Sequence, residues 1–215
     1  MMWVALAFMS AALLGCYDFF KKVSLKENAV LPVLFLNTLF SALLFMPFIL
    51  LSHSGVIEEG MLYVPAADMR THLFLVLKAV IVLSSWICGY FAMKHLPITI
   101  VGPINATRPV MVLLGALLIF GERLNGYQWV GVLLAMVSFL LLSRSGKREG
   151  IDFRHNRWIY FVVLSSVLGA VSALYDKFLM QRFDSMVVQS WFTIYQFFIM
   201  GVVLLVLWYP HRKQS

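Results

Sequence analysis

Long apolar runs separated by short polar segments dominate the chain. Seven runs have membrane-spanning length, since about 20 apolar residues cross the roughly 30 Å hydrocarbon core of a bilayer. They cover residues 3–20, 31–51, 72–93, 97–120, 127–143, 158–178 and 187–209. No stretch between them is long or polar enough to form a soluble domain. The pattern predicts an all-α membrane protein, built as a multi-span helical bundle.

The composition agrees with lipid as the main surroundings. Of the 215 residues, 61% are hydrophobic and 13% are charged, against about 45–50% and about 25% in soluble domains. The lipid bilayer is therefore the first predicted partner. The net charge of +7 raises the question of nucleic acid. No basic stripe with interleaved aromatic residues is present, however, so we predict no nucleic-acid partner.

The chemistry-bearing residues do not form an enzyme motif. Cys16 and Cys88 both lie in apolar runs, without a CxxC or Cys/His cluster, so neither a disulfide framework nor a metal site is predicted. The sequence has no HExxH, no GxSxG and no phosphate-binding glycine loop. We therefore predict no enzyme, no catalytic residue and no cofactor, and any transport would run without ATP.

The basic residues predict how the bundle sits in the membrane. Eleven of them follow odd-numbered runs: Lys21, Lys22, Lys26, Lys94, Arg144, Lys147, Arg148, Arg154, Arg157, Arg212 and Lys213. Only three, Arg70, Arg123 and Arg182, follow even-numbered runs. Because cytoplasmic loops are enriched in Lys and Arg, the N-terminus is predicted to lie outside a plasma (inner) membrane that the chain crosses several times.

The beginning of the chain recurs near its end. A shift of 158 residues places YDFF (residues 17–20) over YDKF (residues 175–178), with further identities along both runs. Five runs precede the second copy, an odd number, so that copy enters the membrane from the opposite side. Such inverted-topology repeats are a common plan of secondary transporters. The pattern predicts an inverted five-plus-five helix repeat whose second half is truncated after two helices.

The segment GERLNGYQWVGVLLAMVSFLLL (residues 121–142) follows the fourth run. Together with the five-plus-five plan and the short loops, it resembles the EamA branch of the drug/metabolite transporter superfamily. In that family the fourth helix typically ends in a GE-[RK]-L motif, at the positions of Gly121, Glu122, Arg123 and Leu124 here. We expect a structural role for these four residues, with Glu122 favoured by the dipole of the next helix.

The resemblance implies three segments. Residues 1–143 form a first EamA-like five-helix repeat, residues 144–157 a basic linker loop, and residues 158–215 the start of an inverted second repeat. It also implies secondary transport of a small-molecule metabolite by alternating access, in a partial chain. The partners left open are a second copy in a homodimer or the missing C-terminal helices. One alternative is a non-transporting membrane remnant or assembly partner, and a lipid-directed membrane enzyme is another.

Arg108 is the most conspicuous polar residue inside an apolar run. An arginine at a helix centre costs about 2.5–3.5 kcal/mol on insertion scales, so it usually faces a bundle interior or an aqueous cavity. Pro103 and Pro109 flank it and free backbone carbonyls. We predict that Asn105 and Arg108 line a substrate cavity that favours an anionic group. The alternative is that Arg108 only hydrogen-bonds the freed carbonyls.

Other polar and aromatic residues supplement this site. Lys78, Trp86 and Tyr90 are candidates for the cavity wall, although Lys78 could instead extend toward the membrane surface and the aromatic pair could simply pack. The repeat mates Tyr17 and Asp18, and Tyr175 and Asp176, are candidates for a gate. For the charges among them, the sequence suggests pairing of Asp176 with Lys177 and of Asp18 with Lys21 or Lys22. Interface anchoring is the alternative for the tyrosines.

Overall fold

The computed structural model describes residues 2–121, 123–146 and 156–211. Its α-helices are α1 (Met2–Ser24), α2 (Val30–His53), α3 (Met69–His95), α4 (Ile98–Asn105), α5 (Arg108–Phe120), α6 (Gly126–Gly146), α7 (Arg157–Met180) and α8 (Ser185–Val203). Two short elements, the π-helix η2 (Leu204–Trp208) and the 3-10 helix η3 (Tyr209–His211), follow α8. The prediction of a multi-span helical membrane protein is confirmed, since six helical segments within these ranges are long and apolar enough to cross a membrane.

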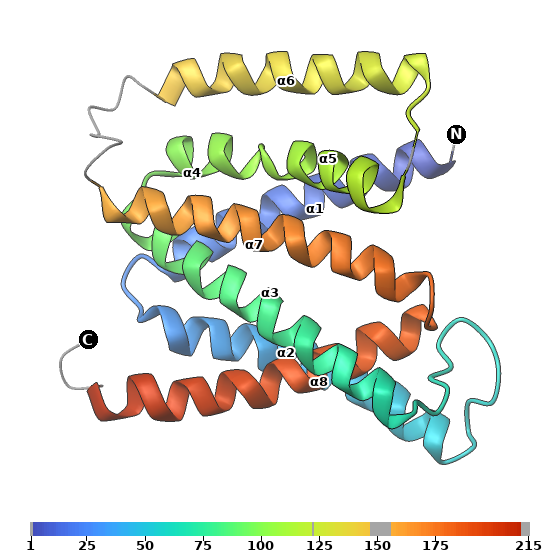
Figure 1. Ribbon diagram of the computed structural model, residues 1–215. Helices are drawn as coiled ribbons and strands as arrows, with labels where there is room; N and C mark the ends of the chain where they lie inside the picture. The colour runs from blue at the N-terminus through green and yellow to red at the C-terminus, as the bar shows by residue number, and fades with distance from the viewer. Residues whose placement is uncertain (1, 122, 147–155, 212–215) are drawn as a thin grey trace.

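The helices run back and forth between two ends of the bundle (Figure 1). The α1–α2 and α3–α4 connections lie at one end with η3, which we name the basic end because Lys21, Lys22, Lys26 and Lys94 fall there. The α2–α3, α5–α6 and α7–α8 connections lie at the opposite end. Figure 1 also shows α1 and α7 running in opposite directions, as an inverted repeat requires. The repeat boundaries themselves stay a prediction.

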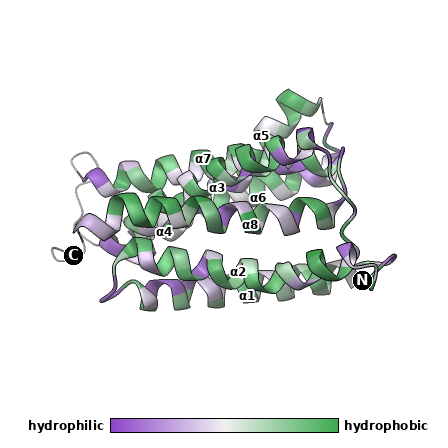
Figure 2. Cartoon of the chain, turned by 90° about the horizontal axis from the view of Figure 1, so that it is seen from below, coloured by the Kyte–Doolittle hydropathy of each residue, from purple (hydrophilic) through white to green (hydrophobic). Residues whose placement is uncertain are grey.

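Apolar side chains cover the outside of the helices. Figure 2 shows hydrophobic residues along most of the helix lengths, with hydrophilic ones gathered largely at the helix ends and loops. Phe8 on α1 and Leu118 on α5 are 74% and 85% exposed. A soluble protein rarely shows such continuous apolar surface. The outside of this bundle therefore suits acyl chains.

Helix α3 holds the bundle together through its contacts with α7. The hydroxyl of Ser85 donates to the carbonyl of Ser165, and that of Ser165 donates to the carbonyl of Ser85, each over 2.8 Å. A Cβ added at Gly89 would come within 2.7 Å of the Ser165 Oγ atom. In lipid, small residues and such hydroxyl bonds drive helix association, so this face brings the two backbones close.

The fourth apolar run, predicted as one bent span, forms two helices. α4 ends at Asn105 and α5 begins at Arg108. Pro109 explains the break, because it has no N–H to donate and its ring would clash with the carbonyl of Asn105 four residues earlier. A proline is tolerated in the first turn of the new helix.

The GERLNGYQ segment ends one helix and starts the next. Gly121 closes α5 with a φ of 63°, a left-handed conformation that glycine adopts without strain. Asn125 accepts from the N–H of Gln128 and Gln128 accepts from the N–H of Asn125, both over 2.9 Å. This reciprocal capping box starts α6. Glu122, predicted to serve the helix dipole here, lies outside the described residues.

Candidate functional site

A cavity of about 680 Å³ lies at the basic end between α1 and α2. Its volume falls within the range of small-molecule sites, roughly 300–1,000 Å³. Its wall combines polar and aromatic groups with aliphatic side chains from α2. Its lining residues include Tyr17, Phe20 and Lys21 from α1, Pro32, Val33, Leu36 and Asn37 from α2, Tyr90 from α3 and Trp208 from η2.

Three of these side chains form a connected group. The hydroxyls of Tyr17 and Tyr90 lie 2.9 Å apart and share a hydrogen bond. The Lys21 ammonium lies 4.1 Å from the centre of the Tyr90 ring and 5.7 Å from that of Tyr17. Tyr17 and Lys21 are four residues apart, so α1 presents both on one face. The cation is thus held over two aromatic rings.

The predicted pair Asn105 and Arg108 faces α7. The Asn105 side-chain oxygen accepts from the Ser166 hydroxyl over 3.0 Å. The Arg108 guanidinium approaches the Ser165 carbonyl at 3.5 Å and lies against Gly169, where a Cβ would meet its Cζ and Nε atoms at 2.5 Å. Neither residue lines the described cavity. Arg108 contacts a carbonyl of α7 and not one freed by the neighbouring prolines.

Asp18 follows Tyr17 on α1 and interacts electrostatically with both Lys21 and Arg108. Its other suggested partner, Lys22, instead donates to the carbonyls of Met93 and of Leu96, the latter over 2.9 Å. Lys22 therefore caps the C-terminus of α3, where a positive charge complements the helix dipole.

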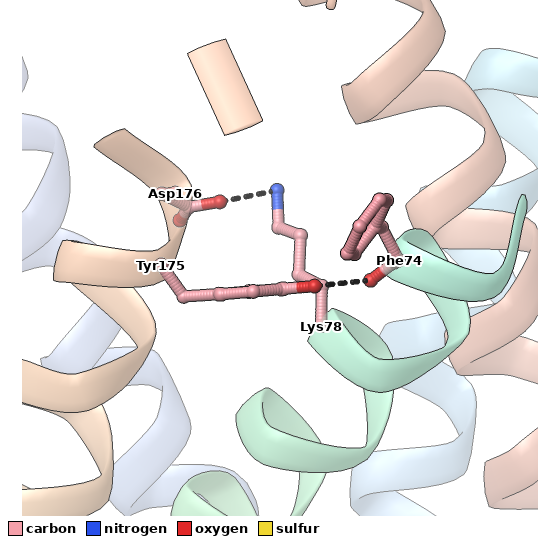
Figure 3. Close-up of polar contacts among 4 residues, drawn as sticks. All are labelled: Phe74, Lys78, Tyr175 and Asp176. Carbon is pink, nitrogen blue, oxygen red and sulfur yellow. Dashed lines mark hydrogen bonds and ion pairs between the residues drawn. The ribbon is translucent and has the colours of Figure 1, made fainter. Parts of the chain in front are cut away.

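A second polar group lies toward the opposite end, between α3 and α7 (Figure 3). The Lys78 ammonium and the Asp176 carboxylate are 2.6 Å apart, and the Tyr175 hydroxyl donates to the Phe74 carbonyl over 3.2 Å. Lys78 also lies 4.2 Å from the centre of the Phe192 ring. The suggestion that Lys78 extends to the membrane surface is wrong, because its side chain is 3% exposed. Asp176 pairs across helices and not with its neighbour Lys177.

The two remaining aromatic candidates have different surroundings. Tyr90 lines the cavity, whereas Trp86 packs against the hydrophobic cluster of Ala79, Val82 and Phe192. A four-residue spacing places two side chains on one helix face. It does not say whether a cavity or another helix covers each of them. For Trp86, the structure agrees with packing.

Lys21 and Asn37 line the cavity but were not among the predicted site residues. Lys21 counted only as one of the basic residues that orient the chain. The signal that could have found it is its spacing from Tyr17, one helical turn apart. Over the ranges that the structure covers, no group of three or more His, Cys, Asp or Glu side chains could hold a metal ion.

Comparisons with known proteins agree on a membrane transporter. The sequence model of the EamA-like transporter family matches residues 1–144. An "Uncharacterized transporter" of Archaeoglobus fulgidus is 26% identical over 158 residues, which cover 73% of this chain and 52% of that protein. An "Uncharacterized transporter in cobO 3'region" of Sinorhizobium sp. is 35% identical over 74 residues, covering 34% of this chain and 52% of that protein.

No solved structure matches the chain. The chain spans about half the length of the curated relatives it matches. The family match extends over the first five apolar runs, including the GERL segment and the broken fourth span. On that match, the chain belongs to the EamA-like transporter family.

Proposed function

We propose that the protein carries a small metabolite across the plasma membrane by alternating access, without ATP. The moving parts are the first repeat, residues 1–143, and the inverted second repeat that begins at residue 158. Further helices or a second copy of the chain complete the assembly. The N-terminus lies outside, so the basic end with its cavity faces the cytoplasm.

The observation that carries this proposal is the ion pair between Lys78 and Asp176. It joins α3 of the first repeat to α7 of the second, at some distance from the cavity. Ionisable groups inside a membrane protein are costly and mark pathways or gates. The Asp176 side chain is 38% exposed while that of Lys78 is 3% exposed, so the carboxylate has room to move away from the ammonium. Such a pair can open and reform as the repeats move.

The repeat mates support gates at two levels. Tyr17 bonds α3 at Tyr90, and its mate Tyr175 bonds α3 at Phe74. These α3 positions are 16 residues apart, about 24 Å along the helix axis. Asp18 follows Tyr17 and Asp176 follows Tyr175 in the sequence, and each carboxylate lies near a cation. In this proposal, the cavity at the basic end is accessible while the contacts between α3 and α7 are closed.

The test is metabolite export and uptake in cells expressing the full chain. We expect wild-type expression to change the ratio of cell to medium content for at least one metabolite by about threefold or more, and Asp176→Asn to abolish that change, because a gating charge is lost. Glu59→Gln, which removes a carboxylate from the exposed α2–α3 loop, is the control and should behave as wild type. Profiles identical to those of cells with an empty vector, despite membrane insertion of the chain, would favour a non-transporting assembly partner.

A further inference from the structure

We infer that the cavity at the basic end binds a small organic anion with a single negative charge and an apolar body, and that Lys21 binds the charged group. The inference deepens the proposed transport function and rests on it. It moves the anion-binding role from Arg108, which faces α7, to a residue on the cavity wall.

Lys21 supplies the cation of the cavity wall. Asp18 interacts electrostatically with both Lys21 and Arg108, but it lies within 4 Å of neither cation. Lys78 and Asp176 form the only ion pair within 4 Å among the residues that the structure covers, so Lys21 has no such partner there. Its ammonium instead lies over the rings of Tyr17 and Tyr90.

Neutral donors on the wall add to this attraction. Two hydroxyls that share one hydrogen bond use one proton between them, so one O–H of the Tyr17–Tyr90 pair is left over. Tyr17 also interacts with Asn37 on the same wall, and this polar group offers O–H and N–H donors to an anion. The first turn of α2 also lines the cavity, and its N-cap residue Ala29 makes no side-chain capping bond. The positive end of that helix dipole therefore favours negative charge.

The rest of the wall determines the shape of the ligand. Phe20, Leu36 and Trp208 supply apolar surface, and Pro32 and Val33 extend it along α2. An apolar ring or short chain attached to the anionic group would cover this surface. Glu27 also lines the cavity, on the exposed α1–α2 loop. A second negative charge on the ligand would be repelled by this carboxylate, so a single charge is expected.

The test measures binding to the purified full chain in lipid nanodiscs at low salt by titration calorimetry. The anionic probes are benzoate and hexanoate, and their neutral amides, benzamide and hexanamide, are the matched ligands. Phenyl phosphate tests the divalent case. We expect at least one monoanion to bind about tenfold or more tightly than its amide, since a close charge pair is worth that much, and phenyl phosphate to bind more weakly.

Variants of the chain test which residue binds the charged group of the ligand. Lys21→Gln should weaken binding of the monoanion by about tenfold and leave the amide unchanged, and Lys21→Arg should restore most of the affinity. Lys26→Gln removes a neighbouring exposed cation and should change neither ligand. Equal binding of both anions and their amides to the wild type would overturn the inference, even if no variant folded. So would unchanged anion binding by a folded Lys21→Gln protein.

The two proposals fail in different ways. Transport of a neutral or cationic metabolite, with no preference for the anions, would leave alternating access standing and refute the anion site. Preferential anion binding that depends on Lys21, in a chain that transports nothing, would support the site and refute the transport function.

Discussion

At the scale of single residues, the polar groups of this protein are held by specific partners. Lys78 is almost fully buried, yet its charge meets Asp176 and the face of the Phe192 ring. Lys22 is held by two carbonyls at the end of α3. Each of these two ammonium groups therefore interacts with protein groups in place of water. The two members of the Lys78–Asp176 pair differ in burial, because the Lys78 side chain is 3% exposed and that of Asp176 is 38% exposed.

This asymmetry predicts unequal effects of the two neutralising changes. Asp176→Asn leaves the buried Lys78 charge without its partner and should lower the free energy of unfolding by on the order of 3 kcal/mol. Lys78→Met should cost less, because the charge that it leaves unpaired, that of Asp176, is much less buried. Thermal unfolding of the purified variants, followed by circular dichroism, measures both.

The double variant Lys78→Met with Asp176→Asn is the control for this comparison. It removes both charges together and should be more stable than Asp176→Asn alone. An equally low unfolding temperature for the double and the Asp176→Asn variants would show that the carboxylate acts through contacts other than Lys78.

At the scale of elements, α7 is a helix whose small residues receive side chains from its neighbours. Ser165 exchanges hydrogen bonds with Ser85 of α3, and Gly169 accommodates the Arg108 guanidinium of α5. Both residues belong to the same face, four positions apart. The break between α4 and α5 is what allows Arg108 to start a new helix against that face. The small residues of α7 therefore allow the close approach of a charged side chain as well as that of a neighbouring helix backbone.

Gly169→Ala should therefore destabilise the protein by about 1 kcal/mol, the low end of the cost of overpacking, because the new methyl group would overlap Arg108 but the guanidinium is the far end of a flexible side chain and can shift. Gly131→Ala on α6 is the matched control, because a Cβ there meets no atom within 4 Å in the described structure. Thermal unfolding compares the two. Adding Arg108→Ala to Gly169→Ala should remove the overlap, and a double variant that gains nothing would contradict this account.

The cap of α3 predicts a pH dependence. Asp68 accepts the N–H of Thr71 over 2.9 Å and also its hydroxyl, and these bonds hold the pKa of the Asp68 carboxyl below its usual range. A carboxyl with a depressed folded pKa stabilises the fold above its unfolded pKa. That contribution disappears as the pH falls through the folded pKa. The first turn of α3 should thus loosen below about pH 4.

Hydrogen exchange of the Thr71 and His72 amides between pH 6 and pH 3, corrected for intrinsic rates, measures this loosening. Asp68→Asn retains a capping oxygen that does not titrate. In this variant, the hydrogen-exchange protection of the two amides should not change with pH. A pH response of the same size in the Asn variant would assign the effect to another group.

At the scale of the whole molecule, α3 connects two sites of different character. The cavity with Tyr17, Lys21 and Tyr90 lies at the basic end, and the Lys78–Asp176 pair joins α3 to α7 further along. The α1–α2 and α2–α3 loops lie at opposite ends of the bundle (Figure 1). In the proposed alternating access, these two sites would lie at different depths along the axis of the bundle, and the two repeats would move around them.

The membrane orientation can be tested with cysteines. In a chain with Cys16→Ser and Cys88→Ser, Glu59→Cys on the α2–α3 loop should react with a membrane-impermeant maleimide in intact cells. Lys26→Cys on the α1–α2 loop should react only after permeabilisation, because loops rich in Lys and Arg stay in the cytoplasm. The reverse pattern would place the N-terminus inside, and labelling of both in intact cells would contradict the bundle.

Much of the architecture was predictable, because lipid imposes simple rules on a chain. Apolar runs of about 20 residues must form helices in a bilayer, since every backbone group needs a partner. Length and hydropathy therefore predicted helices at every apolar run that the structure describes. Pro109 likewise indicated a bend, although the two separate helices α4 and α5 go beyond that expectation.

Length and hydropathy were enough to locate the segments that can span a membrane and the polar residues within them. Which of those residues meet became clear from the packing of the helices. Lys78 pairs with Asp176, almost a hundred positions away, and not with a near neighbour; Arg108 faces Gly169, and Lys21, not Arg108, lines the cavity. The reason is physical. Hydropathy is a sum over local residues, whereas the partner of a buried charge depends on how helices rotate and cross when their small residues pack.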